Sequence, residues 1–334
     1  MKNKITKHSW IFFLLVIIAI EFVVFGAANP KFLRPQLFFT GLNDHLAIGI
    51  IAIFVTMVMI TGGIDIQVPA LVGLTSITIG VLWQDFGMNI WIASLIAFIF
   101  VGLCGALSGF FIAYCDVQPM VITLGGSFLY SGIALLISTL SSTEAYQGIS
   151  GLPESFKFLG KFKLFGLIPL QFFIFIALIL LASFLLNRTK YGRMVFLVGT
   201  NPEAAEYSGI KSERVIMSTY VLSALSAAIA GTIMTSYLGT AKSDLGGDLT
   251  MDIITAVVLG GTLTTGGKGN VFSTALAALI IAIMKFGMPL CFGINTQYLD
   301  IPVGIFLIIV VVGRSYFGNK GFNFTALFGE KNPS

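Results

Sequence analysis

Apolar runs and short polar breaks alternate along almost the whole chain. Most runs approach the roughly 20 apolar residues that a helix needs to cross a hydrocarbon layer of about 30 Å. They are continuous, whereas the strands of a membrane barrel would alternate in polarity over about ten residues. The pattern predicts about ten transmembrane helices, at residues 10–27, 42–61, 66–83, 90–114, 118–140, 167–187, 215–238, 251–265, 270–290 and 299–313. The third and eighth are short or broken by glycine, so nine or eleven spans are alternatives.

Composition agrees with this pattern. Charged residues make up 10% of the chain and apolar residues 56%, against about 25% and 45–50% in soluble domains. The apolar excess is spread over nearly the whole sequence, so one buried core does not explain it. The prediction is an all-α polytopic membrane protein with a single transmembrane domain, residues 1–334. No basic stripe with interleaved aromatic residues is present, so nucleic acid is not an expected partner.

The Lys and Arg residues beside the spans predict the orientation, because such residues are enriched on the cytoplasmic side. With both termini in the cytoplasm, twelve of the 19 Lys and Arg residues lie inside and six outside. The remaining one, Lys285, falls within a span. This orientation also predicts a large external loop at about 141–166 and a cytoplasmic loop at about 188–214.

Motifs for catalysis or for a bound cofactor are not found. The only Cys and His residues are Cys104, Cys115, Cys291, His8 and His45, and their spacing indicates neither a disulfide framework nor a metal site. HExxH and GxSxG are absent. In "VVLGGTLTTGGKGNVF" two glycines have the spacing of a phosphate loop, but the lysine comes one residue late and no Ser or Thr follows it. The sequence thus predicts no catalytic residues, no metal and no ATPase site of its own.

The predicted cytoplasmic loop, "NRTKYGRMVFLVGTNPEAAEYSGIKSERV", is rich in charge. Within it, Asn201 can cap a helix whose first residue is Pro202, with acidic residues near its positive end and Gly209 as its stop. An ordinary solvated loop is the alternative interpretation. A capped and preorganised helix is, however, well suited to dock in a groove of another protein at low ordering cost. The candidate docking residues are Asn201, Pro202, Glu203, Ala204, Ala205, Glu206 and Gly209.

Polar residues also interrupt the apolar runs. In "MITGGIDIQVPALVGL", Asp65 and Gln67 lie between two spans. An acidic residue at this depth should face protein or water rather than lipid; a tight turn in the headgroup layer is the equally weighted alternative. Thr123, in "VQPMVITLGG", could form a hydrogen bond across helices. Asp244 belongs to the external segment "GTAKSDLGGDLTMD", for which solvation alone is a sufficient explanation.

Four stretches together resemble one transporter family. "ITGGIDIQVPALVGL", "VQPMVITLGG", "GRMVFLVGTNPEAAEYSGI" and "AVVLGGTLTTGGKGNVFSTALAALI" resemble, in this order, the ribose-type permeases of bacterial ABC sugar importers, and the likeness covers about residues 10–314. "IEFVVFGAANPKFL", "SYLGTAKSDLG" and "IVVVGRS" are most similar to the autoinducer-2 importers of that family. Gln67 and Pro69 depart from the Ser and small residues that related permeases tend to carry.

The resemblance implies a pore-forming subunit in the bacterial inner membrane. Its partners would be an ATP-binding subunit, a second permease and a soluble periplasmic binding protein; ATP would be used by the partner, and this chain would hold no cofactor. Pro202–Gly209 would be the coupling helix seated on the ATPase. Transport of a small sugar-like solute would proceed by alternating access, and the candidates along its path are Asp65, Gln67, Thr123 and Asp244.

Other interpretations remain open. A ribose or xylose permease would share most of these features. An ion-coupled secondary carrier would need ionisable residues within the membrane, for which Glu21, Asp65 and Lys285 are the candidates. A membrane enzyme or scaffold is a third, weaker possibility.

Overall fold

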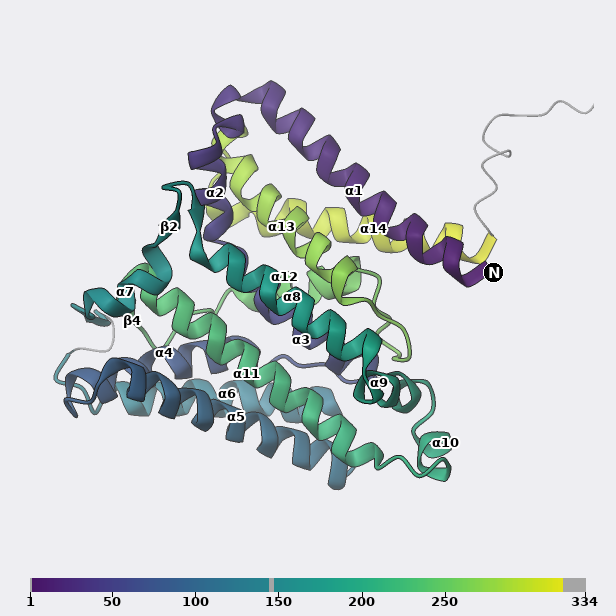
Figure 1. Ribbon diagram of the computed structural model, residues 1–334, viewed down its shortest axis with the longest axis horizontal. Coiled ribbons are helices and arrows are strands. Elements are labelled where there is room, and N and C mark those ends of the chain that lie inside the picture. Colours follow the sequence, from purple (N-terminus) through teal and green to yellow (C-terminus); the bar gives the residue numbers. More distant parts are fainter. Residues whose placement is uncertain (1, 144–146, 321–334) are drawn as a thin grey trace, which may run out of the picture.

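Helices make up most of the structure. The computed structural model describes residues 2–143 and 147–320 (Figure 1). Its helices are α1 (Lys2–Ala28), η1 (Pro30–Leu33), α2 (Pro35–Asn43), α3 (Leu46–Ile60), α4 (Val68–Gln84), α5 (Ile90–Tyr114), α6 (Pro119–Ser138), α7 (Glu154–Lys161), α8 (Leu170–Arg188), α9 (Lys190–Thr200), α10 (Pro202–Tyr207), α11 (Ser212–Leu238), α12 (Leu249–Leu259), α13 (Val271–Phe292), η2 (Thr296–Tyr298) and α14 (Asp300–Lys320).

The expected all-α polytopic fold is confirmed. Among the described residues, six helices are long and apolar enough to cross a membrane, and the bent pair α2 and α3 would be a seventh span. The two helices of that pair meet at 51°. The predicted spans 66–83, 251–265 and 299–313 correspond to shorter apolar helices, α4, α12 and Thr296–Val312. All ten predicted runs are thus helical, while the count of ten spans stays a prediction.

Helix α3 is the centre of the molecule. Every one of its residues is buried, and it packs against α8, α11, α12 and α13. Helix α4 is buried from Val68 to Val81 and packs against α5, α6 and α11. Protein rather than lipid therefore surrounds both helices. Non-helical backbone, such as the chain between these two helices, is tolerated within a membrane where other helices enclose it.

The peripheral helices expose large apolar side chains. Val23 on α1, Phe128 on α6 and Leu180 on α8 are 70%, 73% and 65% exposed. Large contiguous apolar surfaces are rare on soluble monomers. These surfaces are the ones expected to face lipid or another membrane subunit.

Small residues allow α5 and α11 to pack closely. A Cβ atom at Gly105 would overlap Ala224, and one at Gly109 would lie 3.0 Å from the backbone of Met217. Without a hydrophobic force between helices in lipid, such close backbone approach is a main source of their association.

The two ends of the helix bundle differ. Figure 1 shows the described N-terminus, α10 and the end of α14 at one end, and α7 and β4 at the other. At the α7 end the two predicted external segments are joined, because β1 (Ile149–Ser150) pairs antiparallel with β4 (Thr240–Ala241). A second antiparallel pair there is formed by β2 (Lys163–Leu164) and β3 (Ile168–Pro169). This is the arrangement that the predicted topology requires; which end faces the cytoplasm stays a prediction.

Candidate functional site

The charged loop folds as two short helices, α9 and α10. The Asn201 side chain accepts a hydrogen bond from the backbone N–H of Ala204 at 3.0 Å, and Pro202 is the first residue of α10. Gly209 follows with φ of +82°, a left-handed conformation that favours glycine. The predicted cap, start and stop are confirmed, although the helix itself ends at Tyr207.

Helix α10 presents most of its surface outward. Only Ala205 is buried, so of the candidate docking residues it alone faces inward, and Asn201, Pro202, Glu203, Ala204, Glu206 and Gly209 are exposed. The Ser212 hydroxyl donates to the Pro202 carbonyl at 3.2 Å, which ties α10 to the start of α11. The helix is therefore held to the bundle on one side and open on the other.

Tyr207 is a residue that the sequence interpretation missed. Its side chain is 94% exposed at the end of α10. Exposed tyrosines are enriched at the centres of protein interfaces, where they act as anchors. The signal was present in the sequence, since Tyr207 is the one aromatic residue within the charged stretch 201–214.

Asp65, Gln67 and Thr123 lie together inside the bundle. Asp65 accepts hydrogen bonds from the Ser223 hydroxyl at 2.7 Å and from the Gln67 backbone N–H at 3.2 Å. The Thr123 hydroxyl donates to the Ile64 carbonyl at 3.1 Å. Asp65 is 2% exposed, and Ser223 lies in the middle of α11. Asp65 therefore faces protein rather than headgroup water, while the depth of this turn in the membrane stays a prediction.

This interior has unused hydrogen-bonding capacity. The side-chain amide oxygen of Gln67, Oε1, accepts a hydrogen bond from the Ser108 hydroxyl at 2.7 Å. The Gln67 Nε2 atom and the Tyr220 hydroxyl are buried and have no hydrogen-bond partner among the described residues. Buried polar groups without partners are costly and therefore rare. Two hydrogen-bond donors are therefore left over in the interior near Asp65.

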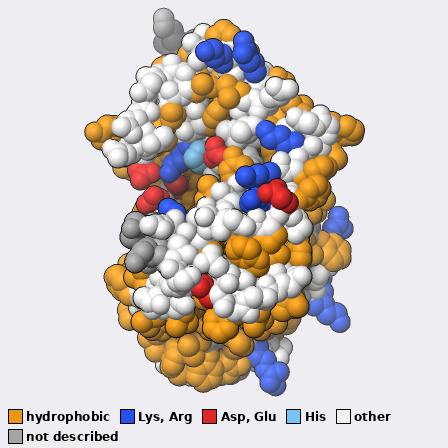
Figure 2. Space-filling model, turned by 90° about the vertical axis from the view of Figure 1, so that its left-hand side faces the viewer, with side chains coloured by type: hydrophobic (Ala, Val, Ile, Leu, Met, Phe, Trp, Pro, Cys, Tyr) orange, Lys and Arg blue, Asp and Glu red, His pale blue; other side chains and the backbone are white. Residues whose placement is uncertain are grey.

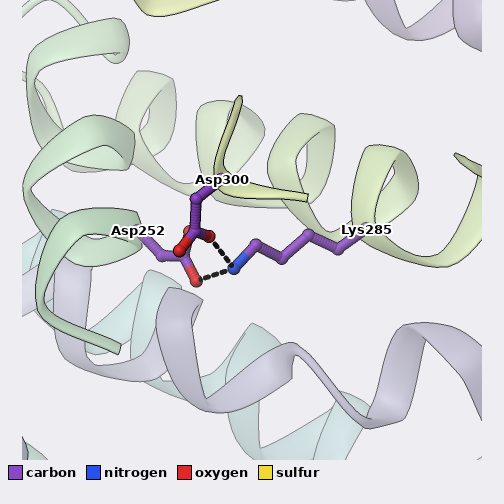
Figure 3. A network of polar contacts seen from close by, with 3 residues as sticks. All are labelled: Asp252, Lys285 and Asp300. Carbon is purple, nitrogen blue, oxygen red and sulfur yellow. Dashed lines mark hydrogen bonds and ion pairs between the residues drawn. The ribbon is translucent and has the colours of Figure 1, made fainter. Parts of the chain in front are cut away.

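A charged network ties three helices together nearer the α7 end. Lys285 on α13 contacts Asp252 on α12 at 2.5 Å and Asp300 at the start of α14 at 3.2 Å (Figure 3). The side chains of Lys285 and Asp252 are 11% and 3% exposed, and that of Asp300 is 73% exposed. A buried charge of this kind is tolerated when it is paired.

The α7 end of the molecule is hollowed and polar. Figure 2 shows acidic, basic and histidine side chains gathered in a hollowed band across this face. A cavity of about 430 Å³ opens there between the end of α11 and the segment 240–249, and its lining includes Lys242, Asp244 and Asp248. Asp244 thus lies apart from the enclosed Asp65, Gln67 and Thr123. The four candidates do not form one site in this conformation.

The segment after β4 folds back into the bundle. A Cβ atom at Gly246, whose φ is +93°, would lie 2.9 Å from the Val72 side chain, and one at Gly73 would overlap the Ser243 carbonyl. The chain therefore runs from the outer β4 down to the first turns of α4, and α12 begins there. This cavity and the interior at Asp65 and Gln67 lie beside the same helix, α4.

Within the described ranges no group of three or more His, Cys, Asp or Glu side chains could hold a metal ion.

Residues 37–311 match the family described as "Branched-chain amino acid transport system / permease component". The chain belongs to this permease family. It is accordingly a multi-pass membrane subunit of a transporter rather than an enzyme.

Curated relatives of this permease carry a more specific name. The chain is 38% identical to the "Autoinducer 2 import system permease protein LsrD" of Escherichia coli (strain K12), over 92% of its own length and 93% of the relative. The protein of the same name from Salmonella paratyphi A is 37% identical over 94% and 93% of the two lengths. The resemblance to importer permeases is confirmed. No solved structure matches the chain significantly.

Proposed function

We propose that this permease is the membrane-spanning subunit of an ABC importer that brings autoinducer-2 across the bacterial inner membrane. The observation that carries the proposal is α10, a capped helix held at one end of the bundle with its open side facing outward. The 38% identity to import permeases along nearly the whole chain supports the same function. In this assignment ATP is bound and hydrolysed by a separate subunit, and this chain holds no cofactor.

Helix α10 is the part assigned to the ATP-binding subunit. Pro202, Glu203, Glu206 and Tyr207 are exposed on it and would enter a groove of that subunit. A helix already formed before binding loses little conformational freedom on docking. A movement of the ATP-binding subunit can then be transmitted through α10 to the membrane helices, whereas a flexible loop would absorb it.

The opposite end is assigned to the solute and its delivery. The hollow beside Lys242, Asp244 and Asp248 offers charged and backbone groups that suit a small hydroxylated molecule. A soluble periplasmic binding protein would deliver the solute there, and a second permease would complete the pathway. The N-terminus and the end of α14 then lie on the cytoplasmic side with α10.

Transport would proceed by alternating access. Closure of the ATPase dimer moves α10, and the two permeases expose their shared cavity to one side and then the other. The enclosed Asp65, Gln67 and Thr123 belong to the closed half of the pathway in this conformation, and Asp244 to its open half. The spare polar atoms of Gln67 and Tyr220 would pair with the solute or with water when that half opens.

Reconstitution tests the proposal directly. Proteoliposomes that contain this permease, its partner permease and the ATPase should take up autoinducer-2 from its binding protein only when ATP is supplied. Glu206→Lys should insert normally but abolish uptake, because it reverses the charge on the exposed face of α10. Uptake that persists without the ATPase and follows an ion gradient would establish the carrier alternative instead. Preferential uptake of ribose or xylose would change the substrate but not the class.

A further inference from the structure

We propose that four glycines at the inner end of the bundle form a rigid joint that passes the movement of α10 to the segment carrying Asp65. The joint consists of Gly62, Gly199, Gly266 and Gly267, packed around the carbonyl of Ile60. It rests on the proposed function, since it says how the docking helix acts on the pathway. The glycines are positioning residues and do not touch the solute.

Three distant segments of the chain meet at this point. Helix α3 ends at Ile60, whose carbonyl accepts a hydrogen bond from the N–H of Gly267 at 2.8 Å. A Cβ atom at Gly199, in the last turn of α9, would overlap the same carbonyl. A Cβ atom at Gly266 would lie 2.7 Å from the Gly199 carbonyl and 3.1 Å from the Gly62 nitrogen. The contact is thus backbone on backbone, without intervening side chains.

The joint lies between the docking helix and the polar interior. Thr200 follows Gly199 and directly precedes Asn201, the cap of α10. On the other side, Gly62 begins the irregular chain that leads to Asp65 and Gln67. Gly266 and Gly267 form the turn between α12 and α13, the helices that carry Asp252 and Lys285. A displacement of α10 is therefore transmitted through this one contact to the segment of Asp65 and Gln67, to α12 and to α13.

Glycine at these positions has a mechanical reason. Gly199 lies inside helix α9, where glycine is intrinsically unfavourable. Gly266 and Gly267 have φ of +86° and +74°, which β-carbon-bearing residues avoid. Close-packed backbone transmits strain, whereas flexible side chains between the segments could change rotamer and absorb it.

The test uses Gly199→Ala, with Gly132→Ala as its matched control. A methyl group at Gly132, in α6, would meet no heavy atom within 4 Å. The alanine at Gly199 must push α9 away from Ile60. We expect ATP-driven uptake of autoinducer-2 to fall about tenfold or more, as an overpacked contact is forced apart. Co-purification of the ATPase subunit and its ATP hydrolysis should stay near wild type, a separation that a general folding defect would not produce.

A second variant, Gly267→Ala, tests the joint from the opposite segment and does not depend on the first. A Cβ atom at Gly267 would lie 2.9 Å from Thr200 Oγ1, at a φ of +74°. We expect the same separation as in Gly199→Ala, with ATP-driven uptake reduced about tenfold or more and with ATPase co-purification and ATP hydrolysis near wild type.

Each outcome decides the matter. Wild-type uptake in Gly267→Ala overturns the rigid joint. Wild-type uptake in Gly199→Ala overturns it as well and leaves the importer function standing. Absence of ATP-dependent uptake in the wild-type assembly overturns the importer function instead.

Discussion

Asp65 is an acidic side chain enclosed by helices, and both of its oxygens accept hydrogen bonds. Replacement by leucine would leave the Ser223 hydroxyl and the Gln67 N–H without their acceptor. Each buried donor left unpaired costs about 1–3 kcal/mol. We therefore expect Asp65→Leu to lower the melting temperature of the detergent-solubilised permease clearly, and Asp65→Asn to lower it less.

The control for this prediction is Asp116→Asn. Asp116 is exposed in the turn between α5 and α6, and its φ of +53° suits asparagine as well as aspartate. Its melting temperature should match wild type. An Asp65→Leu variant as stable as this control would show that the buried carboxylate is not part of the interior hydrogen-bond network.

Single residues also show which structural features can be predicted from their neighbours in the sequence. The cap formed by Asn201 was predictable because its partner, Ala204, is three residues away in the chain. The depth of Asp65 was not, because its partner Ser223 lies on a distant helix. Local patterns fix caps and stops, whereas burial depends on which helices pack around a segment.

Helix α10 should bind its partner mainly through Tyr207. Truncation of an interface anchor costs about 2 kcal/mol or more. Tyr207→Ala is therefore expected to reduce retention of the ATPase subunit about tenfold or more in a pull-down from detergent extracts. Tyr298→Ala is the control, since Tyr298 is 58% exposed on η2 toward the other end of the molecule. Equal retention in both variants would contradict docking through α10.

The charged network should hold α12, α13 and α14 in place. Lys285→Met leaves Asp252 buried and unpaired, which is expected to cost about 3–5 kcal/mol of stability. Lys285→Met combined with Asp252→Leu should recover most of this loss, because no uncompensated charge remains. Asp300→Asn should change stability by about 1 kcal/mol or less, as its side chain is largely exposed. Thermal unfolding of wild type, of these three variants and of Asp252→Leu alone measures the effects. A loss in the double variant equal to the sum of the two single losses would refute the pairing.

This network could not be predicted from the sequence. Lys285 is separated from Asp252 by 33 positions and from Asp300 by 15, and each lies on a different helix. The ten apolar runs themselves were visible, because apolar length is a local property. The shortness of α12 was also visible, because glycines break the eighth run, but the packing of the preceding segment 242–248 against α4 was not.

The permease as a whole has a predicted sidedness that chemical labelling can test. Phe165, in the turn between β2 and β3, and Tyr207 on α10 are 92% and 94% exposed. Single cysteines at these positions, in a protein whose three native cysteines are replaced by serine, should react differently with a membrane-impermeant maleimide. We expect Phe165→Cys to react on intact spheroplasts and Tyr207→Cys only after permeabilisation. The reverse pattern would invert the topology and remove the basis for docking an ATPase on α10.

The complete enclosure of α3 has a consequence for the surrounding bilayer. A mismatch between hydrophobic length and membrane thickness is borne by the surfaces that touch lipid, through tilt or local deformation. Helices α1, α5, α6 and α8 present such surfaces, and α3 presents none. In thinner or thicker membranes the peripheral helices should therefore change their tilt. Helix α3 and the polar interior beside it should keep their geometry.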